Sequence, residues 1–172
     1  MFKQPAVFLD RDGTLMKNVD YPNRAEDVEV FPDARAALAR LKAAGFKNVI
    51  VTNQSGFARG LVTPDGFKAV QGALLLAIGE ENIDGVYICP DFGTRRKPSP
   101  EMVFEAARDF QIDLARSFFI GDKCSDIQCG RNAGVRTIFV ETGCGSGGDC
   151  APDFIAKNLT EAADYILKNE RP

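Results

Sequence analysis

The 172-residue sequence contains no histidine. This absence excludes Ser-His-Asp and Cys-His catalysis, a phosphohistidine intermediate and any zinc site that uses imidazole. A nucleophile or general base must therefore be an Asp, Glu, Lys, Ser, Thr, Cys or Tyr side chain.

The sequence also lacks long apolar runs and a strong excess of charge. No run approaches the roughly 20 apolar residues that span a bilayer, and residues 1–5 include no apolar signal region. These features predict a cytoplasmic protein without a membrane partner. A net charge of −3 argues against a nucleic-acid partner. The length and ordinary composition predict one domain over residues 1–172. We expect the protein to be a monomer or a weak homo-oligomer.

The five cysteines are an odd number at irregular spacing, which is not a disulfide framework. Cys89, Cys124 and Cys129 lie in or next to predicted buried elements, where free cysteine packs well. Cys144 and Cys150 flank a glycine-rich loop, and whether they pair is left open.

Predicted strands and helices alternate along the chain. Apolar runs predict strands at residues 6–9, 48–52, 85–88, 117–120, 137–140 and, more weakly, 153–156. Helix signals lie between them, at residues 34–41, 63–80, 99–110, 126–133 and from 158 onward. Thr63 and Ser99 are expected to be N-caps, and Asn158 with Glu161 resembles a capping box. Such alternation predicts an α/β fold of three layers, a parallel sheet with helices on both faces, whose ligands bind beyond the carboxyl ends of the strands.

The first predicted strand ends in Asp10-Arg11-Asp12-Gly13-Thr14. Two carboxylates two residues apart at a strand end can approach one phosphate, one attacking it while the other handles a proton. A plain acidic turn after a strand fits the run equally well.

Three further motifs follow predicted strands or precede a helix. Thr52-Asn53-Gln54-Ser55-Gly56 offers a hydroxyl, two amides and backbone N–H groups to phosphate oxygens, or is an ordinary turn. Arg95, Arg96 and Lys97 could neutralise and grip anionic groups, or form a solvated basic loop. Gly121-Asp122 with Asp126 suits Mg²⁺, or caps a helix.

Together these motifs occur in the order acid pair, hydroxyl, lysine, acid pair, each at or beyond a predicted strand end. Over nearly its whole length the chain resembles the haloacid dehalogenase (HAD) superfamily of phosphatases. The runs Asp10-Arg11-Asp12, Thr52-Asn53-Gln54-Ser55-Gly56 and Arg96-Lys97-Pro98 are similar to one branch. That branch contains the D-glycero-D-manno-heptose 1,7-bisphosphate phosphatases and the histidinol-phosphate phosphatases.

The resemblance implies a role for each motif residue. Asp10 would be the nucleophile that forms an aspartyl-phosphate, and Asp12 the acid and base. Thr52 and Lys97 would hold the phosphoryl oxygens. The side chains of Asp10 and Asp122, with the backbone carbonyl of Asp12, would bind Mg²⁺, and Asp126 would orient Lys97 or the metal shell.

Two departures from relatives concern the loops. Members of the branch often carry a Cys-Pro-His zinc loop with two more cysteines after it. Here Asp91 follows Cys89-Pro90 and no cysteine lies between Asp91 and Lys97, so no structural zinc is expected. The usual insertion points for a cap domain, residues 15–31 and 89–96, are short, which predicts an open site without a cap. Specificity would then come from loop residues, for which the candidates are Asp20, Tyr21, Asn53, Gln54, Ser55, Arg59, Arg96 and Lys123.

The favoured function is a Mg²⁺-dependent phosphomonoesterase acting on a small phosphorylated metabolite, a sugar bisphosphate such as the heptose intermediate. The second candidate is a histidinol-phosphate phosphatase, and the third is a polynucleotide 3′-phosphatase. A non-catalytic phosphate-binding protein and a phosphotransferase or mutase are the other readings of the same residues.

Overall fold

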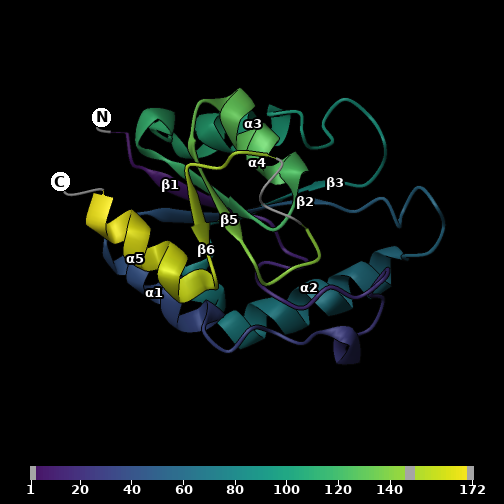
Figure 1. Cartoon of the computed structure of the whole chain (residues 1–172). Helices are drawn as coiled ribbons and strands as arrows, with labels where there is room; N and C mark the ends of the chain where they lie inside the picture. Colours follow the sequence, from purple (N-terminus) through teal and green to yellow (C-terminus); the bar gives the residue numbers. More distant parts are fainter. Residues whose placement is uncertain (1–2, 146–149, 170–172) are drawn as a thin grey trace.

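The computed structural model, which describes residues 3–145 and 150–169, contains a six-stranded parallel sheet (Figure 1). The strand order is β3-β2-β1-β4-β5-β6, so the first strand of the chain lies inside the sheet. Val7 pairs with Asn48 of β2 on one side and with Phe118 of β4 on the other. The strands are β1 (Ala6–Leu9), β2 (Lys47–Asn53), β3 (Gly85–Cys89), β4 (Phe118–Gly121), β5 (Arg136–Val140) and β6 (Phe154–Ala156). The prediction of an α/β fold with a parallel sheet is confirmed.

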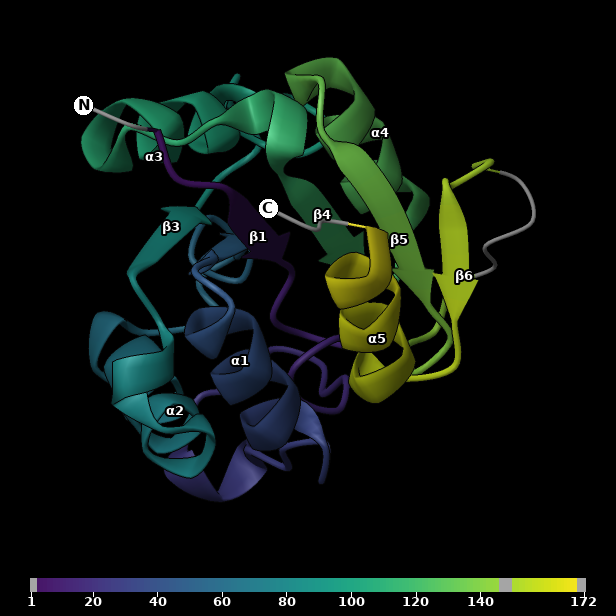
Figure 2. The same cartoon turned by 90° about the vertical axis from the view of Figure 1, so that its left-hand side faces the viewer.

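Helices cover both faces of this sheet, as Figure 2 shows. Helices α1 (Ala34–Ala43), α2 (Pro64–Ile78) and α5 (Leu159–Asn169) lie on one face, and α3 (Glu101–Phe110) and α4 (Cys124–Ala133) lie on the other. Side chains of a strand alternate between the faces, so Val7 and Leu9 pack with the first group while Ala6 and Phe8 pack with the second. Burial on both sides explains why the inner strands β2, β1, β4 and β5 are largely apolar runs.

Helix ends agree with the sequence signals in part. Thr63 caps α2 by accepting a hydrogen bond from the Gly66 N–H at 3.0 Å. The helix ends at Ile78, two residues before the predicted end, because Gly79 has a φ of 81° that helical residues do not adopt. The predicted start of α4 at Asp126 is late by two residues, since the helix begins at Cys124.

Two predicted caps differ from the structure. Pro100, not Ser99, is the N-cap of α3, and Ser99 Oγ only accepts a long 3.4 Å bond from the Glu101 N–H. Before α5, Asn158 Oδ1 accepts from the Glu161 N–H at 3.0 Å, but the Glu161 carboxylate accepts from the Lys157 N–H. Only half of the predicted capping box therefore forms.

No separate cap domain occurs within residues 3–145 and 150–169. The segment between β1 and α1 includes only a short 3₁₀ helix, Ala25–Asp27. Two further 3₁₀ turns are Glu80–Asn82 and Leu114–Arg116. None of the helices in the described part of the chain is long and apolar enough to cross a membrane.

Cys124 is bonded to another cysteine, which differs from the prediction that it is a free, packed thiol. Cys150 forms a disulfide with Cys124, at a Cα–Cα distance of 5.2 Å, and not with Cys144. Cys124 is therefore not a free packed thiol; Cys89 and Cys129 are free and buried, and Cys144 is free and exposed. Sequence spacing could not reveal the pair, because residues 26 positions apart meet only where the chain between β5 and β6 passes the start of α4.

Candidate active site

The candidate active site lies at the carboxyl edge of the central strands. Asp10 directly follows β1, Thr52 and Asn53 end β2, and Asp122 directly follows β4. Lys97 comes from the connection between β3 and α3. Because all strands are parallel, these residues reach the same edge of the sheet.

Lys97 is the centre of a buried ionic network. Its Nζ lies 2.7 Å from Asp10 Oδ1, 2.6 Å from Asp126 Oδ1 and 2.8 Å from the Val51 carbonyl oxygen. Burial alone would lower the pKa of Lys97, but the carboxylates of Asp10 and Asp126 outweigh it and raise the pKa. The lysine is therefore a fixed positive charge at neutral pH, beside the proposed nucleophile.

A side-chain amide fixes the Lys97 backbone. Asn53 Oδ1 accepts from the Lys97 N–H at 3.0 Å, and Asn53 Nδ2 donates to the Lys97 carbonyl at 3.2 Å. These two bonds tie the loop before α3 to the end of β2. Asn53 thus supports the position of the lysine, in addition to lining the cavity described below.

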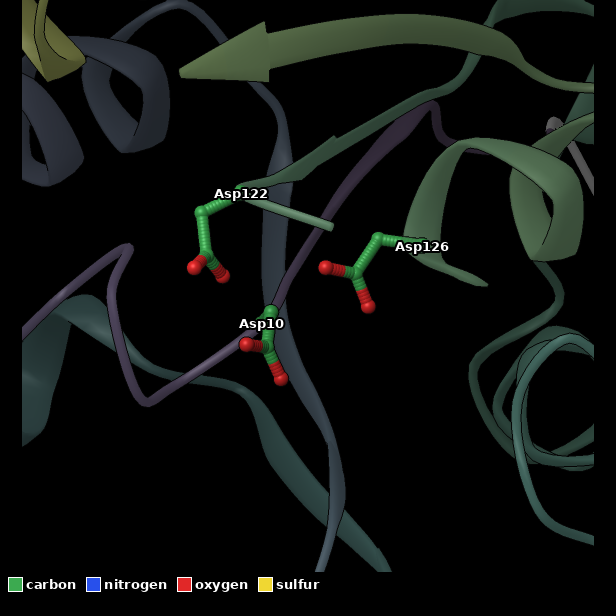
Figure 3. Close-up of side chains that lie close together, drawn as sticks. All are labelled: Asp10, Asp122 and Asp126. Atoms are coloured by element: carbon green, nitrogen blue, oxygen red, sulfur yellow. The ribbon is translucent and has the colours of Figure 1, made fainter. Parts of the chain in front are cut away.

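Three carboxylates lie close together (Figure 3), and two of them contact Lys97. Asp10, Asp122 and Asp126 each offer an oxygen, and these oxygens lie within 4.8 Å of one another. Asp122 is fully buried, and neither of its carboxylate oxygens has a hydrogen-bond partner. Burial, then the charge of Asp10, raises the pKa of Asp122 to about 7, and burial raises that of Asp126 to about 6.

An unpartnered buried carboxylate beside other acids fits a bound cation. Asp126 is already held by Lys97 and by the Lys123 N–H, at 3.1 Å from its Oδ2. Asp10 and Asp122 therefore have the free ligand oxygens, and hard oxygen donors of this kind suit Mg²⁺. Asp126 contacts Lys97, and its role in orienting the lysine or the metal shell stays a prediction.

Two glycines make room for Asp122. A Cβ on Gly13 or on Gly143 would overlap the Asp122 carboxylate, and Gly13 also has a φ of 92°. Thr142 Oγ1 donates to the Gly13 carbonyl at 2.7 Å, joining the two segments. The chain after β5 therefore forms one wall of the site, which the sequence motifs did not indicate.

Asp12 is held in place by two neighbours. Gln54 Nε2 donates to Asp12 Oδ2 at 2.8 Å and to Thr52 Oγ1 at 2.9 Å. Arg11 donates to both carboxylate oxygens of Asp12, from Nε and from Nη2, each at 3.1 Å. Arg11 is 1% exposed, and its guanidinium carbon lies 5.5 Å from the centre of the Phe67 ring in α2. Sequence reasoning gave Arg11 no role, although a cation between two acids at a buried strand end is a signal for one.

Two adjoining cavities open beside these groups. The inner cavity, about 190 Å³, contacts Asp10, Arg96, Lys97, Ser125 and Asp126. The outer cavity, about 200 Å³, is lined by residues of two loops: Asn18, Val19, Asp20, Tyr21, Pro22, Gln54 and Gly56. Asp12, Asn53, Ser55 and Lys123 line both. Of the loop candidates, only Arg59 lies outside both cavities.

The remaining cations have different surroundings. Arg95 forms an ion pair with Glu105 of α3, at 2.5 Å between Nη2 and Oε2, so it is not available to a ligand. Partial burial alone would lower the pKa of Lys123, but Asp10, Asp122 and Asp126 raise it. Arg59 is exposed and contacts Phe92.

Comparison with known proteins agrees with this geometry. Residues 94–162 match the HAD-hydrolase-like family model. The chain is 39% identical to the D-glycero-D-manno-heptose-1,7-bisphosphate 7-phosphatase of Chlorobaculum tepidum, over 94% of each chain. It is 37% identical to the protein of the same name from Thermosynechococcus vestitus, over 98% of each chain. The chain belongs to this phosphatase family.

Solved structures of this HAD phosphatase family have the same fold. The D,D-heptose 1,7-bisphosphate phosphatase of B. bronchiseptica, complexed with magnesium and phosphate, superposes with a TM-score of 0.86. It is 28% identical, and the match covers 96% of this chain and 99% of that one. The corresponding enzyme of Burkholderia thailandensis gives a TM-score of 0.74 at 26% identity, over 96% of this chain and 100% of that one. The resemblance seen in the sequence motifs is therefore confirmed, and the chain is a HAD-type phosphoric monoester hydrolase.

The segment in which relatives often carry a zinc loop, residues 89–91, makes other contacts in this protein. Cys89 Sγ lies 3.5 Å from the backbone oxygen and from Oδ1 of Asp91. Within the described residues, the cysteines form no cluster with metal-ligand spacing. The expectation of no structural zinc stays a prediction.

Proposed function

We propose that this phosphatase removes one phosphate from D-glycero-D-manno-heptose 1,7-bisphosphate, with Mg²⁺ as cofactor and Asp10 as nucleophile. The observation that carries the proposal is that Asp10 lies 2.7 Å from Lys97 and close to the unpartnered Asp122, while Asp10 and Lys97 line the inner cavity. The relatives' names supply the substrate, and the B. bronchiseptica structure contains magnesium and phosphate.

In this mechanism Asp10 attacks the phosphorus atom, and the bond to the leaving sugar oxygen breaks. An aspartyl-phosphate forms, and water then hydrolyses it. Lys97 and Thr52 hold the phosphoryl oxygens, and the Lys97 ammonium offsets their charge as the negative nucleophile approaches. Asp10, Asp122 and the backbone carbonyl of Asp12 would hold Mg²⁺, which supplies the rest of the charge neutralisation.

Asp12 is proposed to protonate the leaving oxygen and then to take a proton from the attacking water. Its position supports this role, because its side chain lines both the inner and the outer cavity. A group there can reach the phosphoryl centre and the sugar oxygen alike. Gln54 and Arg11 would keep the carboxylate oriented through both steps.

The sugar ring would occupy the outer cavity. Asp20, Tyr21, Asn53, Gln54 and Ser55 offer hydrogen-bonding groups there. The absence of a cap in the described part of the chain leaves these loops as the source of specificity. The predicted cytoplasmic location and the prediction of a monomer or weak homo-oligomer remain predictions.

Phosphate release from a panel of substrates tests the proposal. The panel contains the heptose bisphosphate, histidinol phosphate and a 3′-phosphorylated oligonucleotide, with Mg²⁺ and with EDTA. We expect the highest kcat/KM for the heptose bisphosphate and turnover only with the metal. A tenfold higher kcat/KM for histidinol phosphate would contradict the substrate assignment.

The covalent step has its own test in Asp10→Asn, with Asp65→Asn as the matched control. Asp65 is an exposed acid in the first turn of α2, outside the cavities. We expect the first variant to lose turnover by at least about 10³-fold and the control to keep it. Normal turnover by Asp10→Asn would exclude a nucleophilic role for this residue.

A further inference from the structure

We propose that Phe92 is a positioning residue, which holds the guanidinium groups of Arg59 and Arg96 at the rim of the active site so that they bind a second anionic group of the substrate. The inference rests on the proposed function, since it assumes a substrate with one phosphate at Asp10 and another acidic group away from it. It concerns a ring in the β3–α3 loop that has no part in the chemical step.

The evidence begins with the surroundings of the ring. Phe92 is 56% exposed, unusual for a large apolar side chain. The guanidinium carbon of Arg96 lies 5.1 Å from its ring centre, and that of Arg59 lies 5.4 Å away. Both distances are in the range in which the face of an aromatic ring attracts a cation.

The two arginines lack the usual partners of cations. Within residues 3–145 and 150–169, neither has a carboxylate at ion-pair distance, whereas neighbouring Arg95 is paired with Glu105. Arg96 Nη1 is buried and has no hydrogen-bond partner. A buried unpaired donor costs free energy unless a ligand provides the acceptor.

An aromatic ring holds an arginine differently from a carboxylate. A carboxylate would accept N–H bonds and neutralise the charge, while a ring attracts the cation and leaves its donors free. A guanidinium held in this way keeps its planar fork for the oxygens of a phosphate or carboxylate. The ring therefore holds the two guanidinium groups in place and leaves their N–H donors free to bind an anion.

The location connects this cluster to the site. Arg96 lines the inner cavity and directly precedes Lys97. Arg59 follows β2, and backbone bonds from Gln54 N–H to the Cys89 carbonyl (2.7 Å) and from Ala58 N–H to the Pro90 carbonyl (3.3 Å) join the two loops. The Phe92 ring thus contacts arginines from two loops whose backbones are joined by these hydrogen bonds.

The test compares Phe92→Leu, which keeps apolar bulk but removes the ring, with the conservative Phe92→Tyr. Each is assayed with the heptose bisphosphate and with the heptose 7-phosphate, which lacks the second phosphate. We expect Phe92→Leu to raise the KM for the bisphosphate by about tenfold with kcat within about twofold. The monophosphate constants should not change, and Phe92→Tyr should restore the wild-type KM.

A double-mutant cycle separates positioning from a direct contact. If the ring acts by holding Arg59, Phe92→Leu should have a smaller effect on KM in an Arg59→Met background than in the wild type. Independent effects of the two changes would overturn the inference.

Two other results would also overturn it: an unchanged KM for the bisphosphate in Phe92→Leu, or an equal loss with both substrates, which would indicate a structural role. A wild-type enzyme that hydrolyses neither compound would instead contradict the proposed function. A wild-type enzyme that hydrolyses both with equal kcat/KM would overturn the inference alone.

Discussion

The buried end of the active site and its rim hold their charges in different ways. At the buried end, Lys97 is 4% exposed and lies between two carboxylates. At the rim, Arg59 and Arg96 face the ring of Phe92, which is 56% exposed. In the first region Lys97 neutralises charge on Asp10 and Asp126, and Asp122 alone has no partner. In the second region the guanidinium groups remain open to a ligand.

This difference corresponds to two tasks. A phosphoryl group needs fixed charges in a low-dielectric place, since preorganised groups need not rearrange during reaction. Recognition of the rest of a substrate needs donors that are positioned but unused. The comparison predicts that changes at the buried end affect stability and kcat together, while changes at the rim affect binding.

The strongest test of the buried end is Lys97→Met. Removing the ammonium leaves Asp10 and Asp126 buried without a counter-ion, so we expect the free energy of unfolding to fall by about 3–5 kcal/mol. Turnover should fall by at least about 10³-fold. Urea titration and phosphate release measure the two effects, and Lys68→Met, an exposed lysine of α2, is the control. Unchanged stability would mean that the network is not coupled to folding.

A second test needs no mutation and compares the reactivity of a buried thiol, Cys129, with that of an exposed thiol, Cys144. Burial raises the pKa of Cys129 to about 12, so at pH 8 only about one in 10⁴ of these thiols is ionised. Cys144 is exposed, next to Asn18 Nδ2 at 2.6 Å. We expect iodoacetamide to modify Cys144 at least about 10²-fold faster than Cys129, as peptide mass spectrometry would measure. Equal rates would show that the helix layer around Cys129 opens readily.

Asp122→Asn tests the carboxylate that has no partner. Without metal, removing one of three close negative charges should raise the free energy of unfolding by about 1–2 kcal/mol. Wild type should gain thermal stability when Mg²⁺ is added, and the variant should not. Thermal melts in EDTA and in MgCl₂ measure both effects. A variant that is still stabilised by Mg²⁺ would place the metal elsewhere.

The smallest effect is expected at Asp84, far from the site. Its carboxylate lies 2.7 Å from Lys42 Nζ and accepts from the Asn48 N–H at 3.0 Å. Burial opposes its charge, but Lys42, the Asn48 N–H and Lys47 outweigh this and lower its pKa below 3.8. The folded state thus favours the charged form, a stabilisation present above pH 4 and lost as the pH falls through the folded pKa.

The measurement is the free energy of unfolding of Asp84→Asn between pH 2 and pH 7. At pH 7 the variant should be less stable by about 1 kcal/mol, because partly exposed ion pairs are screened by solvent. The difference should disappear in strong acid. A constant difference over the whole range would assign it to hydrogen bonding alone.

Much of the fold could be predicted from sequence because the four inner strands, β2, β1, β4 and β5, are buried on both faces and are apolar runs. The strand-end positions of Asp10, Thr52 and Asp122 could also be predicted, since parallel strand ends meet at one edge, while their catalytic roles and that of Lys97 stay predictions. Asp20 and Tyr21 were candidates because a site without a cap leaves recognition to the loops, and they line the outer cavity.

What sequence did not reveal depends on loop conformation. The Cys124–Cys150 bond and the arginines around Phe92 join segments whose separation in space no periodicity specifies. The contact between neighbouring Arg11 and Asp12 depends on the conformation of the turn after β1. Arg95 and Arg96 are adjacent and chemically equal, yet one pairs with Glu105 and the other lines the cavity. Such choices follow from side-chain packing and not from residue type.

The central place of β1 has a consequence for protein synthesis. This strand leaves the ribosome well before β4, although Phe8 must pair with Phe119. One of its edges therefore stays open while more than half of the chain is translated, and open apolar edges attract other chains. A nascent chain arrested between β3 and β4 should consequently bind chaperones, and release should coincide with the emergence of β4, the step that also brings Asp122 to Asp10.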